Sequence, residues 1–147
     1  MIKLLGAVPE TSAYSDVYSA FETGQIDAAE NSWPAYYLME HYKVAPYYTA
    51  DEHSRVPEIQ LASGKTWSAL PVQYQSIIRR CAEESAAYER QLWAQEEKEA
   101  RQQALKAGCR KITLSKEELE NFRQLVQPLY AQYTGEYLPL VDEIQNA

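Results

Sequence analysis

The stretch that decides the fold is residues 24–37, which read GQIDAAENSWPAYY. Gly24 can adopt a positive φ, so it can end the segment before it. Residues 26–29 are small or apolar apart from Asp27, and a short run of this kind is typical of a buried strand. A polar and aromatic loop follows, and Pro34 then suits the first turn of a helix. The stretch therefore predicts a turn, a short strand, a loop and a helix.

The loop of this stretch is a candidate binding site. Asn31, Ser32 and Trp33 place an amide, a hydroxyl and an indole side by side. In α/β proteins, ligand-binding groups are found in loops that leave the carboxyl ends of strands. The same spacing fits a structural role, in which Asn31 or Ser32 caps the helix and Trp33 anchors it in the core. On spacing alone, the structural interpretation is favoured.

Composition limits the class of protein. The chain has 147 residues, of which 46% are hydrophobic and 24% charged, enough for one domain with a real core. The formal net charge of −7 argues against a nucleic-acid partner, because such partners require basic patches. No run approaches the ~20 apolar residues of a membrane span, so we expect no direct membrane insertion.

The first residues do not fit a secretory signal, because they contain one charge and too short an apolar run. They are expected to form the end of a helix that stops at Gly6, which hints at a missing upstream part.

Several short elements are expected in the first half of the chain. Residues 15–22 and 33–41 predict short helices, and a helical turn is expected around Trp67. Residues 42–49 are rich in strand-forming residues, but Pro46 limits them to an edge or irregular strand. Residues 56–62 alternate enough to predict another strand.

A long helix is predicted over residues 71–107. After Pro71, no glycine or proline occurs until Gly108, and apolar residues recur at helical spacing. About 37 residues would span ~55 Å, so the helix is expected to lie along two lobes or to project from one. Cys81 and Cys109 would then lie roughly 40 Å apart, whereas a disulfide requires Cα atoms within about 7 Å. Two unpaired cysteines are therefore expected.

The end of the chain contains clear helix signals. A short strand is expected over residues 110–114. Ser115 and Glu118 then form a capping box that opens a helix, which Pro128 should bend. After a break at Gly135, residues 136–144 predict a last helix.

No catalytic constellation stands out, and no cofactor site is indicated. The two histidines, His41 and His53, lie on different predicted elements. Asp51, Glu52 and His53 are adjacent in sequence and cannot all converge on one metal ion from a regular element. The twelve tyrosines could stack on sugars and bond their hydroxyls, although packing with the hydroxyl at the surface is the commoner use.

Several ordered blocks resemble a known family, the DctP-type solute-binding proteins of tripartite ATP-independent periplasmic (TRAP) transporters. The blocks are YSDVYSAFETGQIDAAEN at 14–31, NSWP at 31–34, HYKVA at 41–45, YYT at 47–49, HSRVPE at 53–58 and WSALP at 67–71. The Trp-Pro form with the downstream His-Ser-Arg-Val-Pro is most similar to members that bind sugar acids, such as uronates or keto-gulonate. The resemblance runs through essentially all of this chain, but it covers about the C-terminal half of a family member.

The resemblance implies an α/β protein with two lobes, a hinge, and one long helix of about residues 71–107 that crosses both lobes. Residues 1–147 would supply elements of both lobes, and no separate domain boundary is assigned. The family implies a periplasmic receptor, not an enzyme, which hands an organic acid to membrane permease subunits for sodium-driven uptake. Among the ligand-binding residues, Asn31 would complete the carboxylate site, Trp33 would face the sugar and Tyr14 would lie near the cleft.

Departures from the family pattern are visible, among them Pro46, which stands where the family more usually has a lysine. The arginine that holds the ligand carboxylate in the family lies upstream of where this sequence begins, and Ser32 stands where sugar-acid members often have a second asparagine. The missing arginine leaves an alternative open. The chain could instead be a truncated relic or a helical interaction module that binds no solute and associates through the long helix.

Overall fold

The computed structural model describes residues 1–55 and 57–145, which fold as two compact units. Unit 1 comprises Met1–Ala28, Tyr47–Asp51 and the chain from Lys111 onward. Unit 2 comprises Ala29–Pro46 and Glu52–Arg110. The two units are interleaved in sequence, so each is built from segments that lie far apart along the chain.

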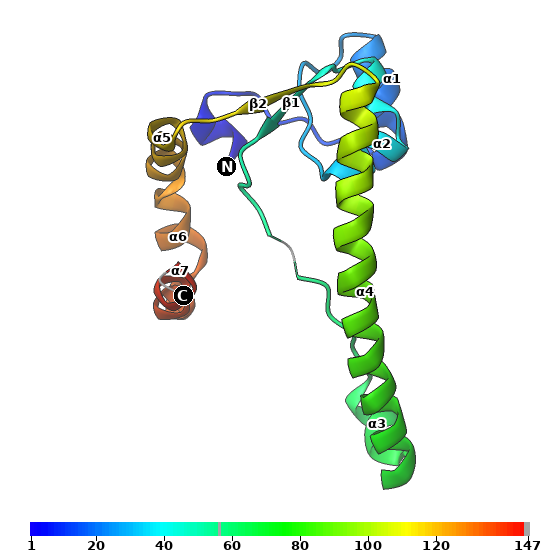
Figure 1. Ribbon diagram of the computed structural model, residues 1–147. Coiled ribbons are helices and arrows are strands. Elements are labelled where there is room, and N and C mark those ends of the chain that lie inside the picture. The colour runs from blue at the N-terminus through cyan, green and yellow to red at the C-terminus, as the bar shows by residue number, and fades with distance from the viewer. Residues whose placement is uncertain (56, 146–147) are drawn as a thin grey trace. The chain divides into compact units, whose positions relative to one another are not determined.

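The main element of unit 2 is the long helix α4, Val72–Lys106, which is continuous over its 35 residues (Figure 1). The prediction of a helix over residues 71–107 is confirmed to within one residue at each end. Pro71 stands at its N-cap position, and Gly108, with φ of 102°, follows its C-terminus. A positive φ of this size suits glycine, which has no Cβ to clash with the backbone.

Helix α2, Trp33–Leu38, packs against the C-terminal part of α4 (Figure 1). The buried residues of α4 in this region are Ala100 and Ala104, which are four positions apart and therefore lie on one face. Their small side chains let another helix approach closely. The partner face of α2 carries Trp33 and Tyr36, both buried. This contact forms the core of unit 2.

An aromatic cluster, defined as Trp33, Tyr36, Tyr37 and Tyr42, joins α2 to the 3₁₀ helix η3, His41–Lys43. Tyr36 meets the Trp33 ring edge to face at 5.9 Å, and Tyr37 stacks on Tyr42 at 5.6 Å. The Tyr36 hydroxyl donates a hydrogen bond of 2.7 Å to the Ala45 carbonyl. Because this polar tip has a partner, the ring can be buried at little cost.

At the other end of α4, side-chain contacts join it to helix α3, Gly64–Ala69. The Gln75 amide donates to the carbonyls of Trp67 and Leu70, at 2.9 and 3.0 Å. The Arg79 guanidinium lies 5.6 Å from the centre of the Trp67 ring, within the range of a cation–π interaction. The predicted helical turn around Trp67 is therefore confirmed.

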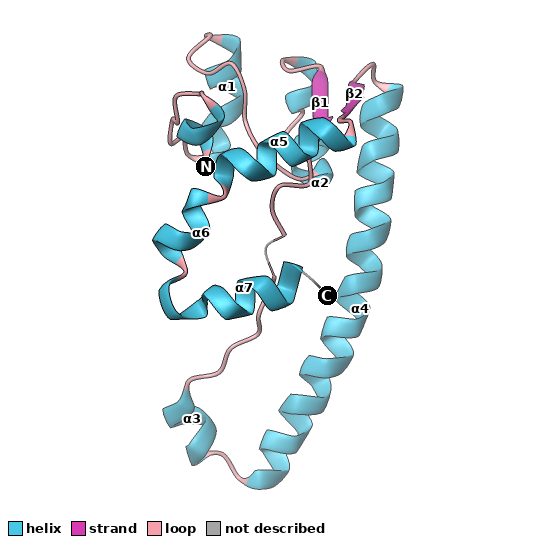
Figure 2. Cartoon of the chain, turned by 90° about the vertical axis from the view of Figure 1, so that its left-hand side faces the viewer, coloured by secondary structure: helices cyan, strands magenta, loops and turns pink. Residues whose placement is uncertain are grey.

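Unit 1 contains the strands β1, Tyr47–Ala50, and β2, Arg110–Thr113, which pair as a two-stranded sheet (Figure 2). Residue 110 itself is assigned to unit 2. Before them come the 3₁₀ helices η1, Ile2–Leu5, and η2, Tyr14–Asp16, and helix α1, Val17–Glu22. Gly6, with φ of 86°, ends η1 as predicted. β1 begins at residue 47, not at the predicted residue 42, and ends at residue 50, one residue later than predicted. β2 ends at residue 113, one residue sooner than predicted.

The C-terminal helices of unit 1 follow the predicted signals. Ser115 and Glu118 form the expected capping box of α5, Lys116–Val126. The Ser115 amide donates to the Glu118 carboxylate at 2.6 Å, and this bond lowers the pKa of that carboxyl group. The Glu118 amide in turn donates to the Ser115 hydroxyl oxygen at 3.2 Å. The helix then stops and α6, Pro128–Tyr133, begins at the predicted proline. The 3₁₀ helix η4, Gly135–Tyr137, leads into α7, Leu138–Gln145.

Two predicted strands are wrong. Residues 26–29 have no strand structure; instead, the amides of Gln25 and Ile26 bond back to the Ala20 carbonyl at the end of α1. Residues 57–62 have no regular secondary structure, and their side chains are exposed. Val56, the first residue of that predicted strand, lies outside the described residues. A strand requires a neighbouring strand, and among the described residues the sheet is made by β1 and β2.

Both cysteines are free. Cys81 is exposed on α4, whereas Cys109, which lies in sequence between α4 and β2, is buried. Within residues 1–55 and 57–145, no helix combines the length and the apolar character needed to cross a membrane.

Candidate functional site

The candidate site is built around residues 30–33, where the chain enters α2. Ser32 is the N-cap residue of α2, and its hydroxyl accepts a hydrogen bond of 3.4 Å from the Ala35 amide. Pro34 occupies the first turn, where its missing N–H costs no helical hydrogen bond. The sequence left the cap open between Asn31 and Ser32, and the structure assigns it to Ser32. Asn31 is therefore not used to cap the helix through its side chain.

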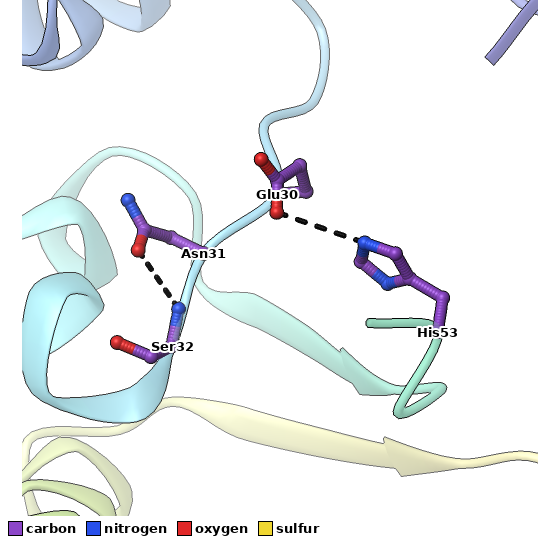
Figure 3. Close-up of polar contacts among 4 residues, drawn as sticks. All are labelled: Glu30, Asn31, Ser32 and His53. Carbon is purple, nitrogen blue, oxygen red and sulfur yellow. Dashed lines mark hydrogen bonds and ion pairs between the residues drawn. The ribbon is translucent and has the colours of Figure 1, made fainter. Parts of the chain in front are cut away.

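The side chain of Asn31 is exposed, and a local hydrogen bond sets its orientation. Its Oδ1 atom accepts from the Ser32 amide at 2.9 Å (Figure 3). A backbone N–H can only donate, so this contact identifies which end of the amide is the oxygen. The amide nitrogen, which carries two hydrogens, faces the other way. The hydrogen-bond donors of the Asn31 amide therefore lie on the side away from the Ser32 amide.

Trp33 is much less accessible than Asn31. Its side chain is 7% exposed and packs edge to face on Tyr36 within the aromatic cluster. This environment fits the role of a core anchor, which the residue spacing alone favours for Trp33. An indole this deeply buried can offer a ligand only its outer edge.

Tyr14 lies in unit 1, whereas Asn31 and Trp33 both lie in unit 2. It opens η2, and its side chain is half exposed. Neighbouring residues line an open polar hollow on unit 1 that includes hydroxyl groups of Ser12 and Ser19 and the carboxylate of Asp16. The structure thus brings two of the three predicted site residues together and places the third in the other unit.

A contact that the sequence analysis missed lies next to Asn31. The Glu30 carboxylate is 3.6 Å from Nε2 of His53, which follows β1 in the chain (Figure 3). Both residues belong to unit 2 but are 23 positions apart in sequence. Both also occur in blocks that carry the family resemblance, and that shared occurrence was the signal that could have linked them.

The second histidine, His41, has a different environment. It is the first residue of η3 and is 3% exposed. Burial disfavours its charged form and so lowers the pKa of the imidazole. Among the described residues, no group of three or more His, Cys, Asp or Glu side chains is arranged to hold a metal ion.

Comparison with known proteins identifies the family. The model of the bacterial extracellular solute-binding protein family 7, DctP, matches residues 1–136. The chain belongs to this family.

Individual DctP-family relatives give the same result. A curated solute-binding protein of Chromohalobacter salexigens is 34% identical over 150 residues, which covers 100% of this chain and 44% of that protein. A Bradyrhizobium TRAP periplasmic solute-binding protein, solved with α/β-D-galacturonate, has a TM-score of 0.86 and 36% identity over 100% of this chain and 49% of its own. One from Roseobacter denitrificans, solved with β-D-glucuronate, has a TM-score of 0.89 and 32% identity, covering 97% of this chain and 48% of its own.

The DctP-family fold is thus confirmed as a part of a two-lobed, helix-rich α/β binding protein. DctP is a family of solute-binding proteins, not an enzyme class, and its members include periplasmic binding proteins. The chain spans about half the length of the relatives it matches. Because the match extends along the whole chain and the two solved relatives named above hold uronates, the alternative of a non-binding helical module is not favoured.

Proposed function

We propose that this chain is part of the solute-binding receptor of a TRAP transporter and that the receptor binds a sugar acid, with a uronate such as glucuronate or galacturonate as the first candidate. The receptor works in the periplasm and delivers its ligand to the membrane permease subunits of the same transporter. It carries out no chemical step on the ligand.

The observation that carries this proposal is the whole-chain similarity to two solved receptors that hold uronates. At 36% and 32% identity, the similarity includes the segment that presents Asn31. The net charge of −7 is compatible with an acidic ligand only if local donors and cations outweigh the overall field. The donors that Asn31 offers are one such local contribution.

In this proposal Asn31 donates from its amide nitrogen to an oxygen of the ligand carboxylate. The bond from the Ser32 amide to Oδ1 holds the side chain in the required orientation before the ligand arrives. Preorganisation of this kind reduces the entropy lost on binding. The guanidinium that the family uses for the carboxylate would be supplied from outside these 147 residues.

Trp33 and Tyr14 have supporting roles in the proposal. Trp33 presents the exposed edge of its indole to the sugar ring and holds α2 in place through its buried part. Tyr14 is half exposed on unit 1, and its part in ligand binding stays a prediction of the family resemblance.

The proposal is tested by calorimetric titration of the complete gene product that carries this chain. Glucuronate and galacturonate are compared with succinate, a C4-dicarboxylate. We expect micromolar or tighter dissociation constants for at least one uronate and much weaker binding of succinate. Tighter binding of succinate would reassign the ligand class, and absence of binding to all three would contradict a carboxylate receptor.

The role of Asn31 is tested by the substitution Asn31→Ala. Loss of a hydrogen bond to a charged ligand group should weaken uronate binding by about 1–3 kcal/mol, or roughly 5- to 150-fold in dissociation constant. Asn121→Ala is a matched control, because Asn121 is an exposed asparagine on α5. An unchanged affinity in Asn31→Ala would remove Asn31 from the site.

A further inference from the structure

The open polar hollow on unit 1 has no part in the proposed contact between Asn31 and a uronate. Its volume is about 390 Å³, which is within the range of small-molecule sites. The residues that line it fall between Thr11 and Gln25, in the loop before η2, along α1 and in the turn that follows. All of them belong to unit 1, so the hollow is complete within one compact unit.

The charge of the hollow comes from the carboxylate of Asp16. This residue stands at the N-cap position of α1, yet its side chain makes no capping hydrogen bond. Instead, the Ser15 hydroxyl donates to its Oδ1 atom at 2.9 Å, which leaves the Oδ2 atom for another donor. No lysine or arginine is found among the described residues that line the hollow. A ligand therefore meets a negative charge that the lining does not neutralise.

Two hydroxyl groups of the hollow are fixed as hydrogen-bond acceptors. The Ser19 hydroxyl donates to the Asp16 carbonyl at 2.9 Å, and the Thr23 hydroxyl donates to the Ser19 carbonyl at 2.8 Å. A hydroxyl has a single proton, so each of these oxygens has only lone pairs left to offer. An ionised carboxylate is likewise restricted to accepting. This part of the hollow therefore suits a ligand that donates hydrogen bonds.

The three acceptors form a row along α1. Asp16, Ser19 and Thr23 are three and four positions apart, and the two outer residues, which flank α1, have helical φ and ψ. This spacing places all three on one face of the helix. At 1.5 Å per residue, the row extends over roughly 10 Å, with the charge at one end and neutral oxygens beyond it. The row matches a ligand with a cation at one end and a hydroxyl group further along.

We propose that this hollow binds a small organic ammonium ion that also carries a hydroxyl group, such as an amino alcohol. The ammonium group has three donors and no acceptor, and it pairs with the Asp16 carboxylate. The ligand hydroxyl donates to the Ser19 oxygen. A uronate does not fit this hollow, because its carboxylate and that of Asp16 repel each other. The net charge of −7 also favours a cation over an anion.

The proposal is tested by titrating the complete gene product with 4-aminobutanol and following the backbone ¹H–¹⁵N signals of residues 11–25. We expect saturable shifts in these signals, with a dissociation constant of millimolar order because the ligand is small and the hollow is open. Butylamine, which lacks the hydroxyl, should bind roughly two- to tenfold more weakly. Butanediol, which lacks the charge, should give no saturable shift.

Variants distinguish the hollow from a general attraction of cations to an acidic chain. Asp16→Asn should weaken the binding of 4-aminobutanol by roughly three- to fivefold. Asp27→Asn is the matched control, because it removes the same charge from an exposed position of unit 1 outside the hollow, and it should leave the affinity unchanged. Ser19→Ala should abolish the advantage of 4-aminobutanol over butylamine, because the ligand hydroxyl then has no partner to lose.

Three results would overturn the proposal: no saturable binding of 4-aminobutanol, equal losses in Asp16→Asn and Asp27→Asn, or an advantage over butylamine that survives Ser19→Ala. None of these measurements depends on a uronate. The proposed function and the ammonium site can therefore fail separately.

Discussion

The two ends of α4 have the same kind of apolar periodicity but different environments. At the C-terminal end, Ala100 and Ala104 are buried where α2 packs on the helix. At the N-terminal end, Val72, Ile77 and Ile78 are exposed. Periodicity therefore selects the face of a helix that can be buried, but whether it is buried depends on segments far away in sequence. Here the covering segment is α2, more than sixty residues earlier in the chain.

The largest expected difference is between two tryptophans. Trp33, on α2, is 7% exposed, whereas Trp93, in the middle of α4, is 50% exposed. Trp33→Ala should lower the free energy of unfolding by about 3–5 kcal/mol, because it removes a buried ring and leaves a cavity. Trp93→Ala should cost less than about 1 kcal/mol. Urea unfolding of the 147-residue chain measures both.

If the two substitutions were equally costly, the comparison would fail. Trp93 would then be covered in solution by something other than the described residues, and a concentration-dependent cost would identify a second copy of the chain as the cover.

A smaller difference is expected between two alanines of α4. Ala104 is 0% exposed and Ala87 is exposed. Ala104→Leu should destabilise the chain by about 1–3 kcal/mol, because the added atoms have no room against α2. Ala87→Leu should change stability by no more than about 0.5 kcal/mol. A neutral Ala104→Leu, measured in the same urea titration, would show that α2 and α4 can separate freely.

The smallest expected effect comes from pH. Burial lowers the pKa of His41, so the folded chain favours the neutral imidazole. As the pH is lowered, the His41 imidazole of the unfolded chain is protonated near pH 6.5, at a higher pH than in the folded chain. The contribution of His41 to stability is therefore complete above about pH 6.5 and falls as the pH drops toward the pKa of the folded state. The unfolding free energies measured at pH 8 and pH 5.5 should differ less in His41→Gln than in the wild type. An equal difference in the two proteins would refute this prediction.

Structural features that depend on residues adjacent in sequence were predictable from the sequence. The ends of α4, the capping box of Ser115 and Glu118, and the new helix at Pro128 all follow from local propensity and capping. The strands at residues 26–29 and 56–62 were not, because strand formation depends on a partner that composition does not reveal.

The candidate site likewise combines a feature that residues adjacent in sequence determine with features that depend on distant contacts. Capping by Ser32 is local and was one of two alternatives open from the sequence. The burial of Trp33 depends on contacts with α4 and η3, and the Glu30–His53 pair joins residues 23 positions apart. The family resemblance placed Asn31, Trp33 and Tyr14 in one site, but spacing alone did not distinguish a ligand-facing indole from a core anchor.

The two free thiols have a practical consequence. Cys81 is exposed on α4, whereas Cys109 is buried. A maleimide dye or spin label added to the folded chain should modify Cys81 first, which marks the long helix without any engineered residue. Cys109 should react only after the packing that buries it opens. The rate at which Cys109 reacts would therefore measure how often that opening occurs.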